Sequence, residues 1–203
     1  MKYYFLILLL SFISCTKGKN ENGMEKRQNQ NQKVIVIQPL GDFELNQSNK
    51  VLSEIRIINP NVVLRKNIPF PENTYYKPRD RYRADSIIKC LKNNIGQDSV
   101  IVGLSNYDIS TTKNGIKDWG VMGLGYLPGK ACVVSNFRLP VKNRNQQFYK
   151  LVLHELGHTA GLPHCALKTC LMRDAEGGNP LNEEIDFCKK CANFLKTKGW
   201  QLI

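Results

Sequence analysis

All three histidines of this 203-residue chain lie in one short segment, HELGHTAGLPH. Apolar residues recur at helical spacing before and within this segment, which predicts a helix over 145–160. On that helix His154 and His158 are four residues apart and share one face, as two ligands of one ion do. Gly161 can adopt the left-handed conformation that ends a helix, and the chain then returns with His164. The spacing predicts a three-histidine zinc site whose fourth position stays open, as hydrolytic zinc requires.

Glu155 directly follows the first of these histidines and can face the metal without binding it. A glutamate in that place can take a proton from water that zinc has acidified, so we expect it to be a general base. An isolated histidine is usually a packed or surface residue with no ligand role. That explanation does not fit the combined pattern of His154, Glu155, His158, Gly161 and His164, which predicts a catalytic zinc.

These residues resemble the active-site motif HExxHxxGxxH of the metzincin zinc peptidases, which a methionine turn follows. Cys165 after the third histidine, then the segment CLM, then the segment CKKC resemble one branch of that group, the archaemetzincins. The resemblance implies a metzincin-like fold and a zinc-dependent peptidase with Met172 beneath the catalytic zinc. It also implies a second, structural zinc, whose ligands are Cys165, Cys170, Cys188 and Cys191.

Three upstream stretches, YYKPRDRYRAD, VGLSNYDI and ACVVSNFRL, also look like archaemetzincin sequence, so the resemblance covers most of residues 33–203. In metzincins an edge strand above the zinc pairs with the substrate backbone. The stretch ACVVSNFRL, residues 131–139, is our candidate for that strand. Because it is short and apolar, a plain core strand is the alternative.

The clustered cysteines can also be interpreted without the resemblance. An exported chain commonly turns pairs of cysteines into disulfides. The intervals here, CxxxxC and CxxC, are close to zinc-ribbon spacing, and the Asn-Pro pair at 179–180 can start a last helix on which Cys188 and Cys191 share a face. We therefore favour structural zinc, with two disulfides as the alternative. Cys90 and Cys132 stand alone, and we expect both to be buried small residues.

From residue 33 onward, short apolar runs alternate with amphipathic stretches. The apolar runs predict strands, and stretches with apolar side chains at helical spacing predict helices. We predict strands at 34–38, 62–64, 99–105, 121–127 and 131–135, and helices at 45–58, 79–94 and 145–160. This order predicts the α/β class: a single compact domain over 33–203 with a mixed sheet, an active-site helix and a helical C-terminal part that zinc would hold in place.

The N-terminus resembles a bacterial lipoprotein signal. Lys2 precedes an apolar run that is too short to span a bilayer, and Ser14 offers a small residue before Cys15. We expect a signal peptide at 1–14, lipidation of Cys15 and a flexible polar tether at 15–32. The protein would then be anchored in the bacterial cell envelope. The alternative is an ordinary cleaved signal or an uncleaved tail, which would leave the protein soluble and secreted or cytoplasmic.

The net charge of +12 and the pI near 9.4 are compatible with an acidic partner such as nucleic acid or anionic lipid. The basic residues are scattered and no aromatic-interleaved motif occurs among them, so we interpret them as a solvated surface and expect no nucleic acid partner. We expect a monomeric zinc metallopeptidase that binds two zinc ions and hydrolyses peptides or proteins. The alternatives are a zinc-binding interaction module without catalysis, which would not need Glu155, and a zinc hydrolase of non-peptide amides.

Overall fold

The computed structural model describes residues 33–202. The expected signal peptide at 1–14, the expected lipidation site Cys15 and the expected tether at 15–32 lie outside the described residues. Within 33–202, no helix combines the length and the apolar character needed to cross a bilayer.

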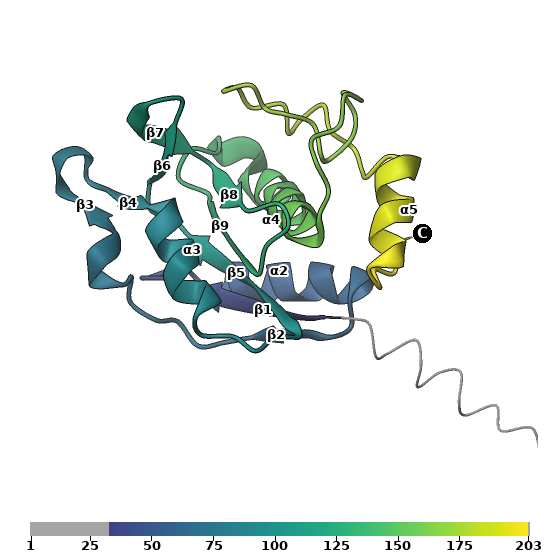
Figure 1. Cartoon of the computed structure of the whole chain (residues 1–203), viewed down its shortest axis with the longest axis horizontal. Helices are drawn as coiled ribbons and strands as arrows, with labels where there is room; N and C mark the ends of the chain where they lie inside the picture. Colours follow the sequence, from purple (N-terminus) through teal and green to yellow (C-terminus); the bar gives the residue numbers. More distant parts are fainter. Residues whose placement is uncertain (1–32, 203) are drawn as a thin grey trace, which may run out of the picture.

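A five-stranded sheet forms the centre of the domain (Figure 1). Its strands lie in the order β2-β1-β5-β9-β8; the first four run parallel, and β8 is antiparallel at one edge. The bounds are β1 Val34–Pro39, β2 Val62–Leu64, β5 Ser99–Ser105, β8 Gly123–Gly125 and β9 Ala131–Ser135. Parallel strands are covered on both faces, which explains why β1, β5 and β9 are apolar runs without strict alternation.

Successive side chains of β1 point to opposite faces of the sheet, so this strand contributes to two cores. Ile35 and Ile37 pack in one core with α2, α4 and α5, whereas Val36 packs in the other with α3. The helices are α2 Leu45–Ile58, α3 Ala84–Lys92, α4 Arg144–Ala160 and α5 Lys189–Thr197. The larger core therefore lies between the sheet and α4, the helix that carries the first two histidines.

A second sheet of four strands, in the order β3-β4-β6-β7, adjoins the first (Figure 1). Its bounds are β3 Tyr75–Tyr76, β4 Arg81–Arg83, β6 Ile109–Lys113 and β7 Ile116–Val121. The β6-β7 hairpin turns at Asn114, with a φ of 50°, and at Gly115, with a φ of 80°. Two positive φ values are typical of a type I′ turn, for which Asn-Gly is a preferred pair. The predicted strands do not include this hairpin, although the Asn-Gly pair signals one.

The helix predicted at 79–94 is wrong in its first turn. It starts only at Ala84, because Arg81–Arg83 form β4 between β3 and β6. Tyr82 on β4 stacks on Phe70, with the two ring centroids 3.9 Å apart. The pairing of β4 with β6 joins segments that are distant in the chain, so local spacing does not reveal the strand.

The last predicted helix also begins later than expected. It starts at Lys189, with Cys188 as its N-cap, and not at the Asn-Pro pair at 179–180. The chain before it cannot be helical because its main chain is bonded elsewhere: Ile185 N donates to Thr169 O at 2.8 Å. The other predicted strands and helices are present, with 121–127 shortened to β8.

The stretch 131–139 is not an edge strand, so our candidate for the substrate-binding strand is wrong. β9 lies between β5 and β8, and all its residues are buried. The core alternative is correct. The edge strand next to β9 is β8, with the sequence GLG, which pairs antiparallel with β9.

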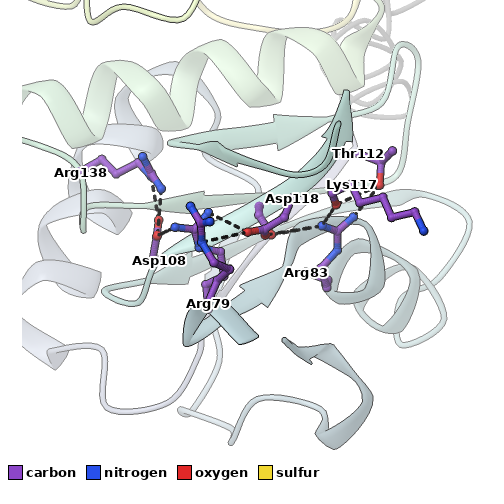
Figure 2. Close-up of polar contacts among 9 residues, drawn as sticks. Arg79, Arg83, Asp108, Thr112, Lys117, Asp118 and Arg138 are labelled. Atoms are coloured by element: carbon purple, nitrogen blue, oxygen red, sulfur yellow. Dashed lines mark hydrogen bonds and ion pairs between the residues drawn. The ribbon is translucent and has the colours of Figure 1, made fainter. Parts of the chain in front are cut away.

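A polar network ties the second sheet to the residues that follow β9 (Figure 2). Arg138 donates two hydrogen bonds to Asp108, with Nε 2.7 Å from Oδ1 and Nη2 2.8 Å from Oδ2. Arg81 pairs with Asp108 at 3.1 Å and with Asp118 at 3.2 Å. Arg138 also lies over Gly120 of β7, where a Cβ would collide with its guanidinium. The network therefore holds β4 and the β6-β7 hairpin in place.

Replacing Asp108 tests this network. The Asp108 side chain is only 8% exposed and is shared by Arg81 and Arg138, so Asp108→Ala would leave Arg81 with Asp118 alone and would remove both hydrogen bonds of Arg138. We expect the free energy of unfolding to fall by about 2 kcal/mol, measured by urea denaturation, because charge-assisted hydrogen bonds to a buried carboxylate are lost. Asp98→Ala, at an exposed position, is the matched control and should change it by less than about 0.5 kcal/mol. Equal stability of the two variants would show that the network does not support the fold.

Candidate zinc centre and active-site cleft

The three histidines converge at the end of α4. His154 and His158 lie one turn apart on the helix, which ends at Gly161 with a φ of 110°. Nε2 of His158 lies 3.2 Å from Nε2 of His164, and the ligand atoms of all three histidines lie within 4.8 Å of one another. Zinc–nitrogen bonds of about 2.0–2.1 Å in a tetrahedron place nitrogens about 3.3 Å apart, close to the separation of His158 and His164. The donor set therefore fits one zinc ion.

The other ring nitrogen, Nδ1, is also engaged in each imidazole. Each partner is an oxygen of residues 161–187, which we call the return segment. Nδ1 of His154 lies 2.6 Å from Leu171 O, Nδ1 of His158 lies 2.8 Å from Leu162 O, and Nδ1 of His164 lies 3.1 Å from Asp174 Oδ2. Because these oxygens accept, Nδ1 carries the proton and Nε2 keeps its lone pair for a metal. Asp174 is not among the predicted site residues, since it lies outside the histidine motif and no local spacing marks it.

The protein environment keeps the two helical imidazoles neutral. Burial, and then the neighbouring His158, lower the pKa of His154 to about 4. Burial likewise lowers the pKa of His158. Since the neutral imidazole is the form that binds a metal, zinc does not have to displace protons from these rings at neutral pH.

Glu155 lies between α4 and the edge strand β8 and is only 5% exposed. A Cβ at Gly123 would lie 2.5 Å from its Oε1, and a Cβ at Gly125 would lie 3.1 Å from its Oε2. The two glycines thus leave the room that the carboxylate fills, and burial raises the pKa of Glu155 to about 8. Sequence reasoning missed both glycines as site residues, although their alternation in GLG marks one face of a strand.

Met172 is fully buried beneath α4. A Cβ at Gly157, between the two helical histidines, would lie 2.6 Å from the Met172 Sδ. The main-chain oxygen of Met172 accepts a hydrogen bond from Cys165 N at 2.7 Å. The methionine therefore supports the helix at the level of the two helical histidines and links it to the first cysteine of the cluster.

The four cysteines of the predicted cluster lie together. Sγ atoms within 4.8 Å of one another belong to Cys165, Cys170, Cys188 and Cys191, and all four are free thiols. Sγ of Cys165 and Sγ of Cys188 are 3.8 Å apart. Zinc–sulfur bonds of about 2.3 Å in a tetrahedron place sulfurs about 3.8 Å apart, so this donor set fits a structural zinc.

The two isolated cysteines differ in burial. Cys132 is fully buried on β9, as predicted. Cys90 is only partly buried, so its prediction as a buried residue is wrong. The reason is the orientation of α3: its buried face runs through Ala84, Ile87, Ile88 and Leu91, and Cys90 lies on its flank.

A cleft of about 650 Å³ opens over the three histidines and Glu155. One wall is formed by β7 and β8 and the other by residues 173–181 and Glu184. A Cβ at Gly177 would lie 3.7 Å from the Trp119 ring of β7, so the two walls approach each other there. The cleft therefore presents three histidines that can hold zinc, a buried carboxylate and a strand edge to a ligand.

Comparisons with known proteins agree with this geometry. A family model described as Peptidase family M54 matches residues 40–197. The archaemetzincins of Natronomonas pharaonis and Halobacterium salinarum are 27% and 29% identical to the chain, each over 171 residues that cover 77% of this chain and 96% of the relative.

The fold is similar to solved archaemetzincin structures. That of Methanopyrus kandleri has a TM-score of 0.69 at 22% identity and covers 83% of this chain and 96% of its own. That of Archaeoglobus fulgidus, complexed with malonate, has a TM-score of 0.67 at 25% identity and covers 79% of this chain and 98% of its own. Because the family model spans most of the chain and these relatives share its fold, the chain belongs to peptidase family M54, the archaemetzincins, and is a zinc-dependent metallopeptidase.

Proposed function

We propose that the cleft hydrolyses peptide bonds with Glu155 as the general base. The observation that carries this proposal is the position of Glu155, which follows His154 in the chain, lines the cleft with the three histidines and packs against β8. Zinc at the histidines would supply a Lewis acid that polarises the scissile carbonyl and acidifies water. Glu155 would accept a proton from that water and later deliver it to the leaving amine.

We infer further that an extended substrate pairs with β8. Within residues 33–202, β8 pairs only with β9, and Gly123, Leu124 and Gly125 all line the cleft. A free strand edge holds a peptide through main-chain hydrogen bonds. Because the two glycines carry no side chain, the substrate backbone can come close to Glu155.

We propose two zinc ions per chain, one at the histidines and one at the four cysteines. The spacing of the thiols supports the second ion. Its role would be structural, because the cluster joins Cys165, the neighbour of His164, to Cys188 at the start of α5. A zinc there would hold the return segment and with it the third histidine.

We also propose that the protein is lipid-anchored at Cys15 in the bacterial cell envelope, and that it acts there as a monomer on peptides or proteins and binds no nucleic acid. The support for the anchor is the sequence of residues 1–15, with its short apolar run and Ser14 before Cys15.

Glu155→Gln tests the mechanism. Zinc content should stay unchanged because the histidines are intact, while kcat should fall by about 10²- to 10⁴-fold because the base is lost. Hydrolysis of a quenched-fluorescent peptide library and metal analysis of the same samples measure both effects. Glu72→Gln, at an exposed glutamate outside the cleft, is the matched control and should retain activity. An unchanged rate in Glu155→Gln would overturn the role of the base.

Replacing Cys188 and Cys191 together by Ser tests the second zinc. The double variant should lose one of two zinc ions, become more sensitive to proteolysis near its C-terminus and bind the catalytic zinc more weakly, although no histidine is changed. Cys90→Ser, which lies outside the cluster, should keep both ions. A wild-type protein with one zinc and no free thiols among the four, measured after denaturation without reductant, would instead establish the disulfides.

Mass spectrometry of membrane fractions tests the anchor. The mature chain should lack residues 1–14 and carry acyl groups on Cys15, because the apolar run is too short to hold the protein by spanning the bilayer. Cys15→Ser should abolish the acyl mass. Recovery of wild-type protein from the soluble cytoplasm with Met1 retained would contradict the proposal.

A further inference from the structure

Glu184 is a buried carboxylate in the wall of the cleft, and the mechanism above does not use it. The residue is 2% exposed and lines the same cleft as the three histidines and Glu155. Its Oε2 has no hydrogen-bond partner within residues 33–202. Buried polar atoms are almost always paired in native proteins. An unpaired carboxylate oxygen at a cleft is therefore a place where a ligand can supply the missing donor.

The cations nearest to this carboxylate are bonded to other oxygens. Lys150 Nζ donates to the main-chain oxygens of Leu181 and Glu184. Arg173 Nη1 pairs with Glu183 Oε2 at 2.7 Å. No ion pair of the described residues involves the Glu184 carboxylate. The two cations thus only moderate the effect of burial, which raises the pKa of Glu184 to about 7.

The other acidic groups around the zinc centre differ from Glu184 in this respect. Asp85 accepts hydrogen bonds from two hydroxyl groups, and Asp174 pairs with His164. Glu176 is exposed to solvent. Of the acidic side chains that line the cleft and are not assigned to the reaction, Glu184 alone is both buried and left with an unpaired oxygen.

Apolar side chains lie next to Glu184 in the cleft. Leu151 and Leu181 are both buried and line it. Leu151 precedes His154 by one helical turn, so it lies on the same face of α4 and connects this part of the cleft to the zinc centre. The methylene stem of a long basic side chain can lie against such leucines while its charged end reaches a carboxylate.

We infer that Glu184 is a specificity-determining residue that binds a protonated nitrogen of the substrate, so that the cleft selects peptides with a Lys or Arg side chain, or a free terminal ammonium, at this subsite. This inference rests on the proposed peptidase function and adds the substrate class to it. The protonated nitrogen would satisfy Oε2 and compensate the buried negative charge. A neutral substrate of equal length leaves the carboxylate unpaired and therefore binds less tightly.

Cleavage profiling tests the inference. The substrates are quenched-fluorescent peptides in which one Lys is placed at each position in turn of a neutral sequence. Each Lys peptide is paired with a peptide that carries uncharged norleucine at the same position. Peptides with a free N-terminus are likewise paired with their acetylated forms. Wild-type zinc-loaded enzyme should show a kcat/KM about tenfold or more higher for the charged member of one pair, and Glu184→Gln should remove this difference. Glu184→Asp should restore part of it, and Glu72→Gln should leave it unchanged. The readout is the ratio of kcat/KM for the charged peptide to kcat/KM for its uncharged match, because a merely structural role of Glu184 would change both kcat/KM values equally.

The peptide series also identifies the source of the nitrogen. A preference that survives N-acetylation and disappears with norleucine assigns a Lys or Arg side chain. A preference that disappears on acetylation assigns the terminal ammonium. A wild-type enzyme that cleaves both members of every pair equally, or a Glu184→Gln variant with unchanged selectivity, overturns the inference while the peptidase function stands.

A binding measurement separates failure of the inference from failure of the proposed function. Zinc-loaded Glu155→Gln protein, which should bind peptides without cleaving them, is titrated calorimetrically with the Lys and norleucine peptides. The Lys peptide should bind about tenfold more tightly, and the additional change Glu184→Gln should equalise the two. If the wild type cleaves no peptide, the proposed function fails, and this titration still decides the inference: equal affinities for the two peptides overturn it.

Discussion

The contacts that hold the Nδ1 atoms of the histidine rings set the geometry of the zinc centre. α4 supplies His154 and His158, but each ring is held at Nδ1 by an oxygen from the return segment. The direction of every Nε2 lone pair therefore follows the path of that segment. Met172 fixes the path from beneath α4, and its bond to Cys165 N links it to the cysteine cluster. The catalytic geometry and the cluster are thus parts of one structural unit.

The second constraint is the close approach of α4 to the edge of the sheet. Glu155 fills the space that Gly123 and Gly125 leave on β8, so helix and strand can come together with a carboxylate between them. The same strand edge is open to the cleft. The β6-β7 hairpin, held by Arg138 and its neighbours (Figure 2), forms the adjoining wall. Substrate, base and metal would therefore meet where two sheets and one helix converge.

Hydrophobic spacing predicts the elements of the central sheet and the helices beside it because their burial follows a regular period. It fails where long-range pairing decides the conformation. Arg81–Arg83 are charged at alternate positions and lie in a strand only because β3 and β6 flank them. The residues before Lys189 have no helical conformation because Ile185 N and Asp186 O bond the main chain of the return segment.

The sequence by itself predicted that the three histidines come together, because residues four apart on a helix lie one turn apart and Gly161 permits the turn toward His164. It also indicated the cysteine cluster through short, local intervals. Only the tertiary structure decided that Asp174 holds the third imidazole, that β8 and not β9 is the edge strand, and that Glu184 reaches the cleft. These contacts join residues that lie on different elements, and their geometry depends on how those elements pack, which no local pattern of residue types encodes.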